Sequence, residues 1–454
     1  MFGCLVAAII LGDTPAAYTL PLHKVAAIPA FARKYGLPCS ACHEAWPKLN
    51  NFGQVFRDNG YQLGNDRDSP IYQNPSYFPI AMRITPNWHR ESSNHVLIDS
   101  VPGDPANQTE ATVTSHGFDL SGIDLWTAGT LYKNISFSLL PSSDETGAFH
   151  FENAFVRFDN LFQSRWLNLK FGKFELDNMI SEKRMFTLSD QGGFYQVYHF
   201  MTVEEANFVN SGVFPLNPGF GLGDNQLGVE LAGHSANSYT RYSVSLLSSN
   251  DGNVDVPNRS YDTFLTFSQA FTAGRLGLQR VGGFAYIGER PTYANTENGS
   301  PITGEGLGNK RFYRAGFAGD WYLGKLDFET VFVHGWDDAH LGTGTPANLP
   351  LPTGAQAPTW NGGFIETHYT YNPQLIFIQR DEWIRVSRQA FASDAANLGD
   401  IDTYTFGLRW YPIMFSRAGL AFHNEYAITK TQGVGPLGED VWSSSLMIGF
   451  DFAF

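Results

Sequence analysis

The last nine residues, LMIGFDFAF at 446–454, decide the fold. Large apolar side chains occupy every second position, and Met447, Gly449 and Asp451 fall between them. Because successive side chains of a strand point to opposite faces, this stretch predicts a strand with one aromatic face. The stretch YTFGLRW at 404–410 repeats the pattern. Strands of this kind are typical of a transmembrane β-barrel, although a soluble β-sandwich also alternates.

The lengths of the connections between such segments favour the barrel. We predict strands at 79–89, 117–132, 135–141, 149–158, 165–176, 225–233, 239–248, 260–271, 276–288, 311–321, 325–336, 361–371, 374–387, 402–411, 416–428 and 442–454. Short connections (133–134, 160–164, 235–238, 272–275, 322–324, 372–373 and 412–415) alternate with long ones such as 177–224, 289–310 and 337–360. Short periplasmic turns and long outer loops give this alternation.

The sequence therefore predicts an all-β fold, an antiparallel outer-membrane β-barrel of about 16 strands. Both ends of the barrel are then on the periplasmic side, and 177–224 is long enough to hold two more strands. The terminal Phe454 on an alternating strand is typical of barrels recognised by the outer-membrane assembly machinery. The chain is accordingly expected in the bacterial outer membrane, in contact with its lipid.

The predicted strand faces opposite the aromatic ones carry charges, at Asp327 and Glu329, Glu366 and His368, Arg380 and Glu382, and His423 and Glu425. This pattern predicts a polar lumen, with a specific ion or proton path as the alternative. In a predicted outer loop, residues 337–340 (Asp-Asp-Ala-His) offer oxygen and imidazole ligands for iron, or form an ordinary solvated acidic loop.

The composition is that of a strand-rich protein with few charges. Of 454 residues, 15% are aromatic and 16% are charged, against about 25% charged residues in ordinary soluble domains. Acidic residues outnumber basic ones by 44 to 30, giving a net charge of −14, so nucleic acid is not an expected partner. No stretch approaches the ~18 consecutive apolar residues of a transmembrane helix.

A second pattern, near the other end of the chain, is Cys39-Ser40-Ala41-Cys42-His43. Two cysteines separated by two residues and followed by histidine are typical of a c-type haem attachment site, although a chance match or half of a zinc site has the same letters. A zinc site of four cysteines would need a second pair, and the only further cysteine is Cys4. We therefore predict one covalent haem c, with thioether bonds at Cys39 and Cys42 and His43 as proximal iron ligand.

A short helical segment is expected around this motif. Residues 30–35 read as a helix ended by Gly36, and Leu49, Phe52 and Phe56 recur at helical spacing before Gly60. The apolar face of the second helix either belongs to an ordinary amphipathic helix or covers the porphyrin. A segment this short cannot bury a core alone, so haem and the barrel must supply the missing surface.

These observations divide the chain into three parts. Residues 1–27 are expected to be a signal peptide cleaved near residue 17 or 27, with a truncated start because no positively charged region precedes the apolar run. Residues 28–77 form the monohaem cytochrome segment that plugs the barrel, and 78–454 form the transmembrane barrel.

The run IPAFARKYGLPCSACH, residues 28–43, resembles the N-terminal fingerprint of the fused outer-membrane cytochrome–porins. In that family a monohaem cytochrome segment precedes a barrel, and members in iron-oxidising bacteria take electrons from extracellular Fe(II). The resemblance covers the whole chain in architecture and residues 28–62 in motif. It implies thioether sites at Cys39 and Cys42 and a proximal ligand at His43. Lys34-Tyr35 departs from the Gln-Thr of the iron-oxidising members, so the fingerprint is more specific for the fusion than for Fe(II).

Electron transfer across the outer membrane is the function that these patterns favour. A haem on either surface cannot bridge a hydrocarbon layer roughly 30 Å thick, so we expect the haem segment to enter the lumen from the periplasmic side. The expected partners are extracellular Fe(II) or another reduced donor, and a periplasmic cytochrome or other electron acceptor. The enzyme class would then be iron(II):cytochrome c oxidoreductase.

Two alternatives stay open. The same conduit run outward would deliver electrons to an extracellular acceptor, since potential depends on axial ligand and burial. A solute porin with a structural or sensory haem plug would conduct solutes and pass no electrons. Covalent catalysis has no support, because the sequence contains neither a GxSxG nucleophile motif nor a zinc-type histidine pair.

The sixth iron ligand is the site residue that the sequence defines least. Met82 is the methionine nearest to the haem segment, and a His/Met iron has the raised potential that Fe(II) oxidation needs. Met82 is also a plausible ordinary residue of the first strand. His89 and His95 are rival ligands, as is His23 if cleavage follows residue 17.

Overall fold

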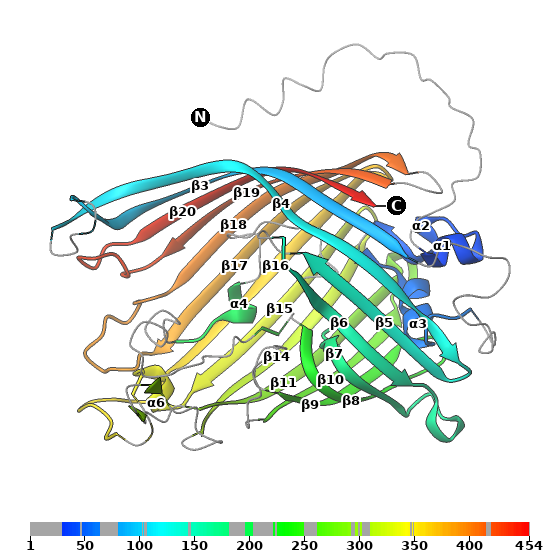
Figure 1. The fold of residues 1–454 in the computed structure, drawn as a ribbon, viewed down its shortest axis with the longest axis horizontal. Helices are drawn as coiled ribbons and strands as arrows, with labels where there is room; N and C mark the ends of the chain where they lie inside the picture. Colours follow the sequence, from blue (N-terminus) through cyan, green and yellow to red (C-terminus); the bar gives the residue numbers. More distant parts are fainter. Residues whose placement is uncertain are drawn as a thin grey trace, which may run out of the picture.

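The structure, a computed structural model, describes residues 30–45, 48–63, 80–101, 103, 107–143, 147–180, 196–202, 221–222, 225–248, 261–291, 296–297, 300–301, 309–345, 347, 349–414 and 419–453. Within these ranges 16 antiparallel strands form one closed barrel (Figure 1). Each barrel strand pairs with the next along the chain, and β20 pairs with β3 to close the ring. The predicted all-β fold with about 16 antiparallel strands is confirmed.

The barrel strands lie close to their predicted ranges. They are β3 (Ala81–Asp99), β4 (Gln108–Tyr132), β5 (Ile135–Ser143), β6 (Phe149–Phe158), β7 (Asn168–Glu175), β8 (Asn225–His234), β9 (Thr240–Ser248), β10 (Tyr261–Thr272), β11 (Leu278–Pro291), β14 (Asn309–Leu323), β15 (Leu326–Asp337), β16 (Thr359–Asn372), β17 (Leu375–Arg388), β18 (Ile401–Met414), β19 (Gly419–Thr431) and β20 (Val441–Ala453). The largest departure is at β3 and β4, which extend as a long hairpin through a polar stretch where the aromatic alternation gives no signal.

The alternation in sequence corresponds to the two faces of the barrel wall. On β18, Phe406 is 55% exposed on the outer face, whereas its neighbour Thr405 is fully buried toward the lumen. On β20, Ile448 faces outward and Asp451 inward. Because outward side chains are apolar on strand after strand, the outer wall suits a lipid environment.

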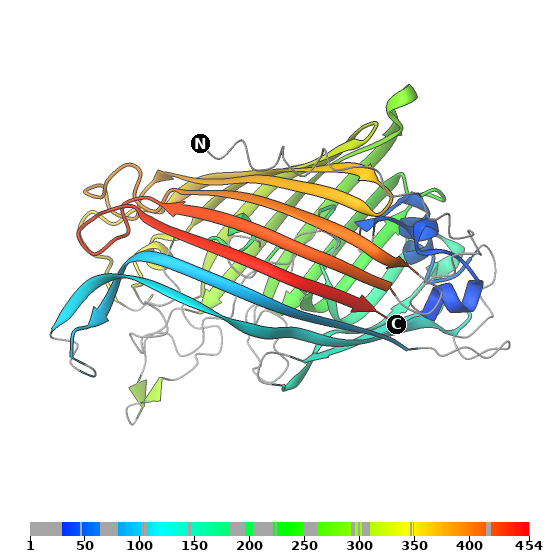
Figure 2. The same cartoon turned by 90° about the horizontal axis from the view of Figure 1, so that it is seen from above.

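The two ends of the barrel differ. Short turns such as 133–134, 324–325 and 373–374 lie at one end, together with the start of β3 and the end of β20. Figure 2 shows the helices α1 to α3 and the C-terminus at this same end. The expectation that both ends of the barrel are at the short-turn end is confirmed.

The long connections hold small elements. These are the two-stranded sheet of β12 (Thr296–Glu297) and β13 (Ser300–Pro301), α4 (Gln196–His199) and α6 (Ala339–Gly342). Among the helices of the described ranges, none has both the length and the apolar character needed to cross a membrane. The expected signal peptide, 1–27, and Phe454 lie outside the described residues, as does most of the 177–224 connection in which two more strands were considered.

Candidate functional site

The segment that carries the cysteine pair is built of short elements packed on one another. They are α1 (Ala30–Tyr35), α2 (Cys39–Cys42), β1 (His43–Ala45), β2 (Lys48–Leu49) and α3 (Asn51–Asp58). We refer to residues 30–63 as the N-terminal segment. The predicted helix at 30–35 is confirmed, and Gly36 follows it with φ +64°, a left-handed conformation that suits glycine.

Asn50 holds the CxxCH motif against α3. Its backbone N–H donates to the Cys42 carbonyl at 2.9 Å, and its side-chain amide donates to the Ala41 carbonyl at 3.0 Å. The side-chain oxygen of Asn50 accepts from the Gly53 N–H at 2.9 Å and so caps α3. Sequence reasoning missed Asn50, although an asparagine directly before a helix is a recognisable N-cap signal.

Gly53 lets α3 approach the motif closely. A Cβ atom at this position would lie 2.2 Å from the Cys42 carbonyl oxygen, a distance that no side chain can occupy. The glycine is therefore required by the contact between α2 and α3 rather than by its φ angle. The two helices fix the positions of Cys39, Cys42 and the adjoining His43 relative to one another.

The apolar residues of this segment are distributed differently from the expectation. Leu49 lies in β2, before α3 begins, because Asn50 caps the helix one residue later. Phe52 is 44% exposed and Phe56 is buried. The predicted single face of Leu49, Phe52 and Phe56 is therefore wrong, and only Phe56 belongs to the contact with the barrel.

Aromatic rings attach the N-terminal segment to β4. The Phe56 ring lies 5.0 Å from that of Phe31, and Phe31 stacks on Tyr61 at 5.4 Å. The Phe31 ring also lies edge-on to Trp126 of β4 at 6.4 Å. Such offset and edge-on pairs are favourable beyond the area that they bury, so this cluster is a specific docking contact.

Buried charges attach the other side of α3. Asp58 accepts from Arg241 of β9 at 2.9 and 3.1 Å, and Arg241 also donates to Asp177 at 2.6 Å. Burial by itself would raise the pKa of Asp58, but Arg241, with His234 and Arg57, more than reverses this and holds that pKa below its usual range. Asp58 is therefore ionised when the N-terminal segment is docked.

Lys48 reaches the wall at the β14–β15 turn. Its ammonium lies 3.3 Å from Asp320, 3.0 Å from Glu329 and 3.6 Å from Glu44, and it also pairs with Asp327. Burial alone would lower the pKa of Lys48, but the surrounding carboxylates raise it well above its usual value. This lysine lies five positions after His43, so the ion cluster adjoins the CxxCH motif.

The side chains around the motif suit a porphyrin. Among the described residues neither Cys39 nor Cys42 is in a disulfide. Burial raises the pKa of the Cys42 thiol, with a smaller contribution from Cys39, so Cys42 is a neutral thiol at pH 7. Cys39 is close enough to Tyr411 of β18 to interact electrostatically. Tyr411 belongs to a buried apolar cluster on the lumen wall (Ile376, Ile378, Tyr411 and Ala421), the kind of surface that an apolar macrocycle contacts.

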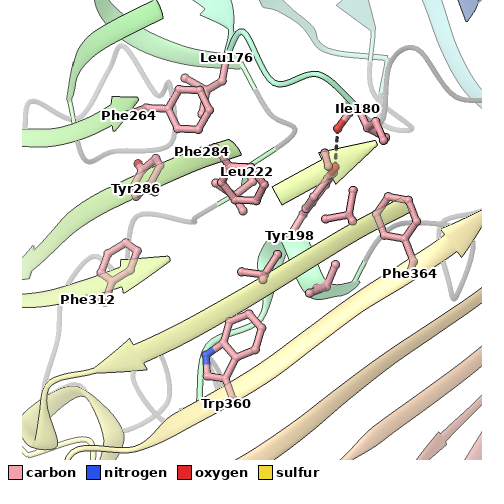
Figure 3. Close-up of a cluster of buried hydrophobic side chains, with 14 of the residues drawn as sticks. Leu176, Ile180, Tyr198, Leu222, Phe264, Phe284, Tyr286, Phe312, Trp360 and Phe364 are labelled. Atoms are coloured by element: carbon pink, nitrogen blue, oxygen red, sulfur yellow. Dashed lines mark hydrogen bonds between the residues drawn. The ribbon is translucent and has the colours of Figure 1, made fainter. Parts of the chain in front are cut away.

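The middle of the lumen contains a hydrophobic core. Figure 3 shows aromatic side chains of β10, β11, β14 and β16 in one cluster with Tyr198 of α4, whose hydroxyl donates to the Ile180 carbonyl. The Val197 N–H donates to Glu382 at 2.8 Å, and Thr202 donates to Asp337 at 2.8 Å, so residues 196–202 of the connection after β7 pack against the inner face of the barrel. The expectation of a polar lumen is therefore correct only in part.

The lumen charges lie where the alternation placed them, and they are buried. His368, Glu366 and Arg380 are fully inaccessible, as is Arg409, which pairs with Asp451. In a wide aqueous channel such side chains would contact water. These inward charges are packed against other protein atoms.

No family model and no curated protein matches the sequence. Solved structures with a similar fold are outer-membrane proteins. An anion-selective porin from Comamonas acidovorans is 9% identical, with a TM-score of 0.46, over 83% of this chain and 99% of the porin. The outer membrane channel DcaP of Acinetobacter baumannii is 11% identical, with a TM-score of 0.46, over 82% and 97%. A loop-deletion mutant of OmpT, an outer membrane protein of Vibrio cholerae, is 12% identical, with a TM-score of 0.43, over 83% and 100%.

Met82 lies on the outer face of β3. Its neighbour Arg83 pairs with Asp451 and Asp124 toward the lumen, and Ala81 is opposite Trp126, which contacts the N-terminal segment. Alternation then turns Met82 outward, away from a haem held in the lumen. The sixth-ligand assignment concerns the haem-loaded protein and stays a prediction, with this geometry against it.

The rival ligands are dispersed. His89 pairs with Asn87 on β3, and His95 lies near the far tip of that strand, where it bonds to Glu110 with Glu439 close by. His23 lies outside the described residues.

The run 337–340 does not form a metal site. Asp337 pairs with Arg314, and Asp338 caps α6 through the His340 N–H. The His340 imidazole contacts the Thr345 carbonyl. These contacts separate the side chains that the sequence offered as iron ligands.

Proposed function

We propose that this chain is an electron-transfer protein of the bacterial outer membrane. It carries one haem c, held by Cys39 and Cys42 with His43 as proximal ligand, in a segment that enters the barrel from the periplasmic side. Its function is to oxidise extracellular Fe(II) and to pass the electrons to a periplasmic cytochrome, as an iron(II):cytochrome c oxidoreductase.

The main observation behind this proposal is the position of the CxxCH motif at the short-turn end of the barrel. When bound, haem would carry one electron at a time, and the residues of this chain would hold the haem in position. Asn50 and Gly53 fix the motif on α3, and the Asp58–Arg241 pair fixes α3 on the barrel. The apolar cluster around Tyr411 offers a dry surface beside Cys39. A redox group placed there would be reachable from the periplasm.

Close packing of inward side chains supports a conduit over a solute pore. Phe364 and Trp360 are fully buried on β16, and His368 and Arg380 are fully buried nearer the short-turn end. Solutes need a continuous water-filled path, whereas electrons do not. The same packing is neutral on direction, so a conduit running outward to an extracellular acceptor is the variant reading of this function.

A solute porin with a structural or sensory haem plug is the second candidate. What favours it is the 16-stranded barrel itself, which resembles structures named as a porin and a channel. This candidate predicts appreciable solute conductance through the purified protein and no haem-dependent reduction across a membrane.

The deciding experiment uses liposomes that contain the purified protein and a trapped redox dye. External Fe(II) should reduce the dye while ionic leak stays small. His43→Ala removes the proximal ligand and should stop the electron flow, while insertion is unchanged because the barrel strands are untouched. His116→Ala, on β4 of the same barrel, is the matched control and should leave the flow intact.

Three outcomes would revise or reject the proposal. Large ion conductance without haem-dependent reduction would favour the porin. Reduction by external dithionite but not by Fe(II) would keep the conduit and reject iron as donor. Absence of covalent haem in protein matured by a cytochrome c assembly system would reject the proposal at its first step.

A further inference from the structure

We propose that Asp327, Glu329 and His368 form a divalent-cation site inside the barrel, at which the Lys48 ammonium competes with the metal ion. The site is assigned to an ion of the Mn(II), Fe(II) and Zn(II) class. The assignment of the metal site does not depend on haem. The choice of Fe(II) as its natural occupant rests on the proposed function.

The three side chains converge from adjacent strands. Asp327 and Glu329 are alternate residues of β15, and His368 lies opposite Asp327 on β16. One carboxylate oxygen from each acid and one imidazole nitrogen all lie within 4.8 Å of one another. All three residues are more than nine-tenths buried. One imidazole with two carboxylates is a donor set for borderline and hard divalent ions.

At this point the carboxylates outnumber the two cationic groups that face them, the Lys48 ammonium and the His368 imidazole. Four carboxylates (Glu44, Asp320, Asp327 and Glu329) lie within ion-pair distance of Lys48. One oxygen of Glu329, Oε2, has no hydrogen-bond partner among the described residues, although the side chain is 98% buried. A buried carboxylate oxygen without a partner is costly unless a cation or water meets it. A divalent ion would meet it directly.

The histidine is oriented as a ligand. His368 Nδ1 lies 2.8 Å from Asp327, on the side of the cluster, and Nε2 lies 2.6 Å from Glu366. Glu366 is held in turn by Arg380 at 3.4 Å. Metal-bound histidines regularly donate their other N–H to such a carboxylate, which fixes the tautomer and the ring orientation. Nδ1, which donates to Asp327 in the structure, would give up its proton to bind the metal ion beside that carboxylate.

Lys48 can leave the site without losing its partners. Glu44, at 3.6 Å, and Asp320, at 3.3 Å, contact its ammonium from outside the ligand set. A metal ion bound by Asp327 and Glu329 would shift the ammonium toward these two. Metal binding and the present position of Lys48 therefore exclude each other, and removal of the lysine should strengthen metal binding.

The test is a Mn(II) titration of the purified full-length protein, followed by the EPR signal of free Mn(II). All variants carry Glu110→Gln, which removes the separate cluster of His95, Glu110 and Glu439. We expect uptake of about one Mn(II). Glu366→Gln should weaken it about 10–100-fold, and Glu329→Gln at least as much. Asp381→Asn, an acid of β17 bonded to Gln379, should change nothing.

Lys48→Met keeps the proposal testable if loss of an acid prevents folding. This variant should bind Mn(II) at least ten-fold more tightly than the parent, because a competing cation is gone. No uptake by either protein, or equal affinity in both, would overturn the proposal. Uptake that survives Glu329→Gln would overturn it too. Failure of electron transfer would leave these results unchanged, because Mn(II) uptake is measured without any haem reaction.

Discussion

Asp58 of α3 accepts two hydrogen bonds from the guanidinium of Arg241 in β9, at 2.9 and 3.1 Å, across 183 residues of sequence. Both side chains are buried, and Arg241 also bonds to Asp177 after β7. One arginine therefore joins the N-terminal segment to two neighbouring parts of the barrel wall. This contact, with the aromatic cluster on β4 and the ion pairs of Lys48, attaches the segment to the barrel.

Arg241→Gln should release the N-terminal segment while the barrel stays closed. The substitution leaves Asp58 and Asp177 buried without their cation, at a cost of about 3–5 kcal/mol. Limited proteolysis should then cut the chain between residues 46 and 79, with unchanged strand content by circular dichroism. Arg311→Gln is the control, because Arg311 pairs with Glu289 at the exposed far end of the barrel. Equal protease resistance of Arg241→Gln and the parent would contradict this role.

Acid should undock the same segment. The pKa of Asp58 is held below its usual range when the segment is docked. A carboxyl group of this kind contributes stability above its unfolded pKa of about 3.9 and loses it as the pH falls through the folded value. Pepsin sensitivity of the segment should therefore appear only well below about pH 4. In Asp58→Asn, docking should be weaker at neutral pH and independent of acid in this range. A parent protein that stays docked at the lowest pH would refute the assignment.

Gly53→Ala should lower the covalent haem content. The added Cβ would lie 2.2 Å from the Cys42 carbonyl oxygen, so α3 must shift and the cysteine pair moves with it. The ratio of haem to protein, measured by pyridine haemochrome, reports the effect. Gly117→Ala in β4 is the matched control, since its Cβ would meet nothing within 4 Å. Full haem content in Gly53→Ala would show that the helix contact does not position the motif.

Phe364→Ala should destabilise the protein and open the lumen. Phe364 is fully buried in the lumen core, and its ring contacts that of Tyr198 at 5.8 Å. Loss of such a side chain typically costs about 3–5 kcal/mol because a cavity remains. Thermal unfolding and conductance in planar bilayers measure the two effects. Ile365→Ala, the next residue, faces outward and should change conductance little. High conductance of the parent itself would show that the core does not block the barrel.

The barrel could be predicted from the sequence because its main signal is local. Alternation at Phe406 and Ile448 reports directly which face meets lipid, and the short turns fix the antiparallel order. The lumen core could not be predicted in this way. Phe364 lies between Gly363 and Ile365, so alternation does not show which face it occupies, and nothing local indicates that α4 returns from a distant connection to pack on it.

Part of the candidate site could be predicted from local sequence and part could not. Cys39, Cys42 and His43 could be proposed from the sequence because haem attachment would require this spacing. Lys48 and His368 are 320 positions apart, and their common contact with Asp327 follows only from the closed barrel. Met82 was chosen for its nearness in sequence, which says nothing about the face of the strand on which a residue lies.

The contacts of the N-terminal segment also determine when the segment can take its place. Lys48 and Asp327 are separated by 279 residues, and the β3–β20 seam joins Arg83 to Asp451 across 368. Contacts this distant form late, after the strands between them have been laid down. The N-terminal segment is therefore among the last parts of the protein to dock. The proposed haem attachment at Cys39 and Cys42 would therefore have to be completed before the barrel closes and the N-terminal segment docks.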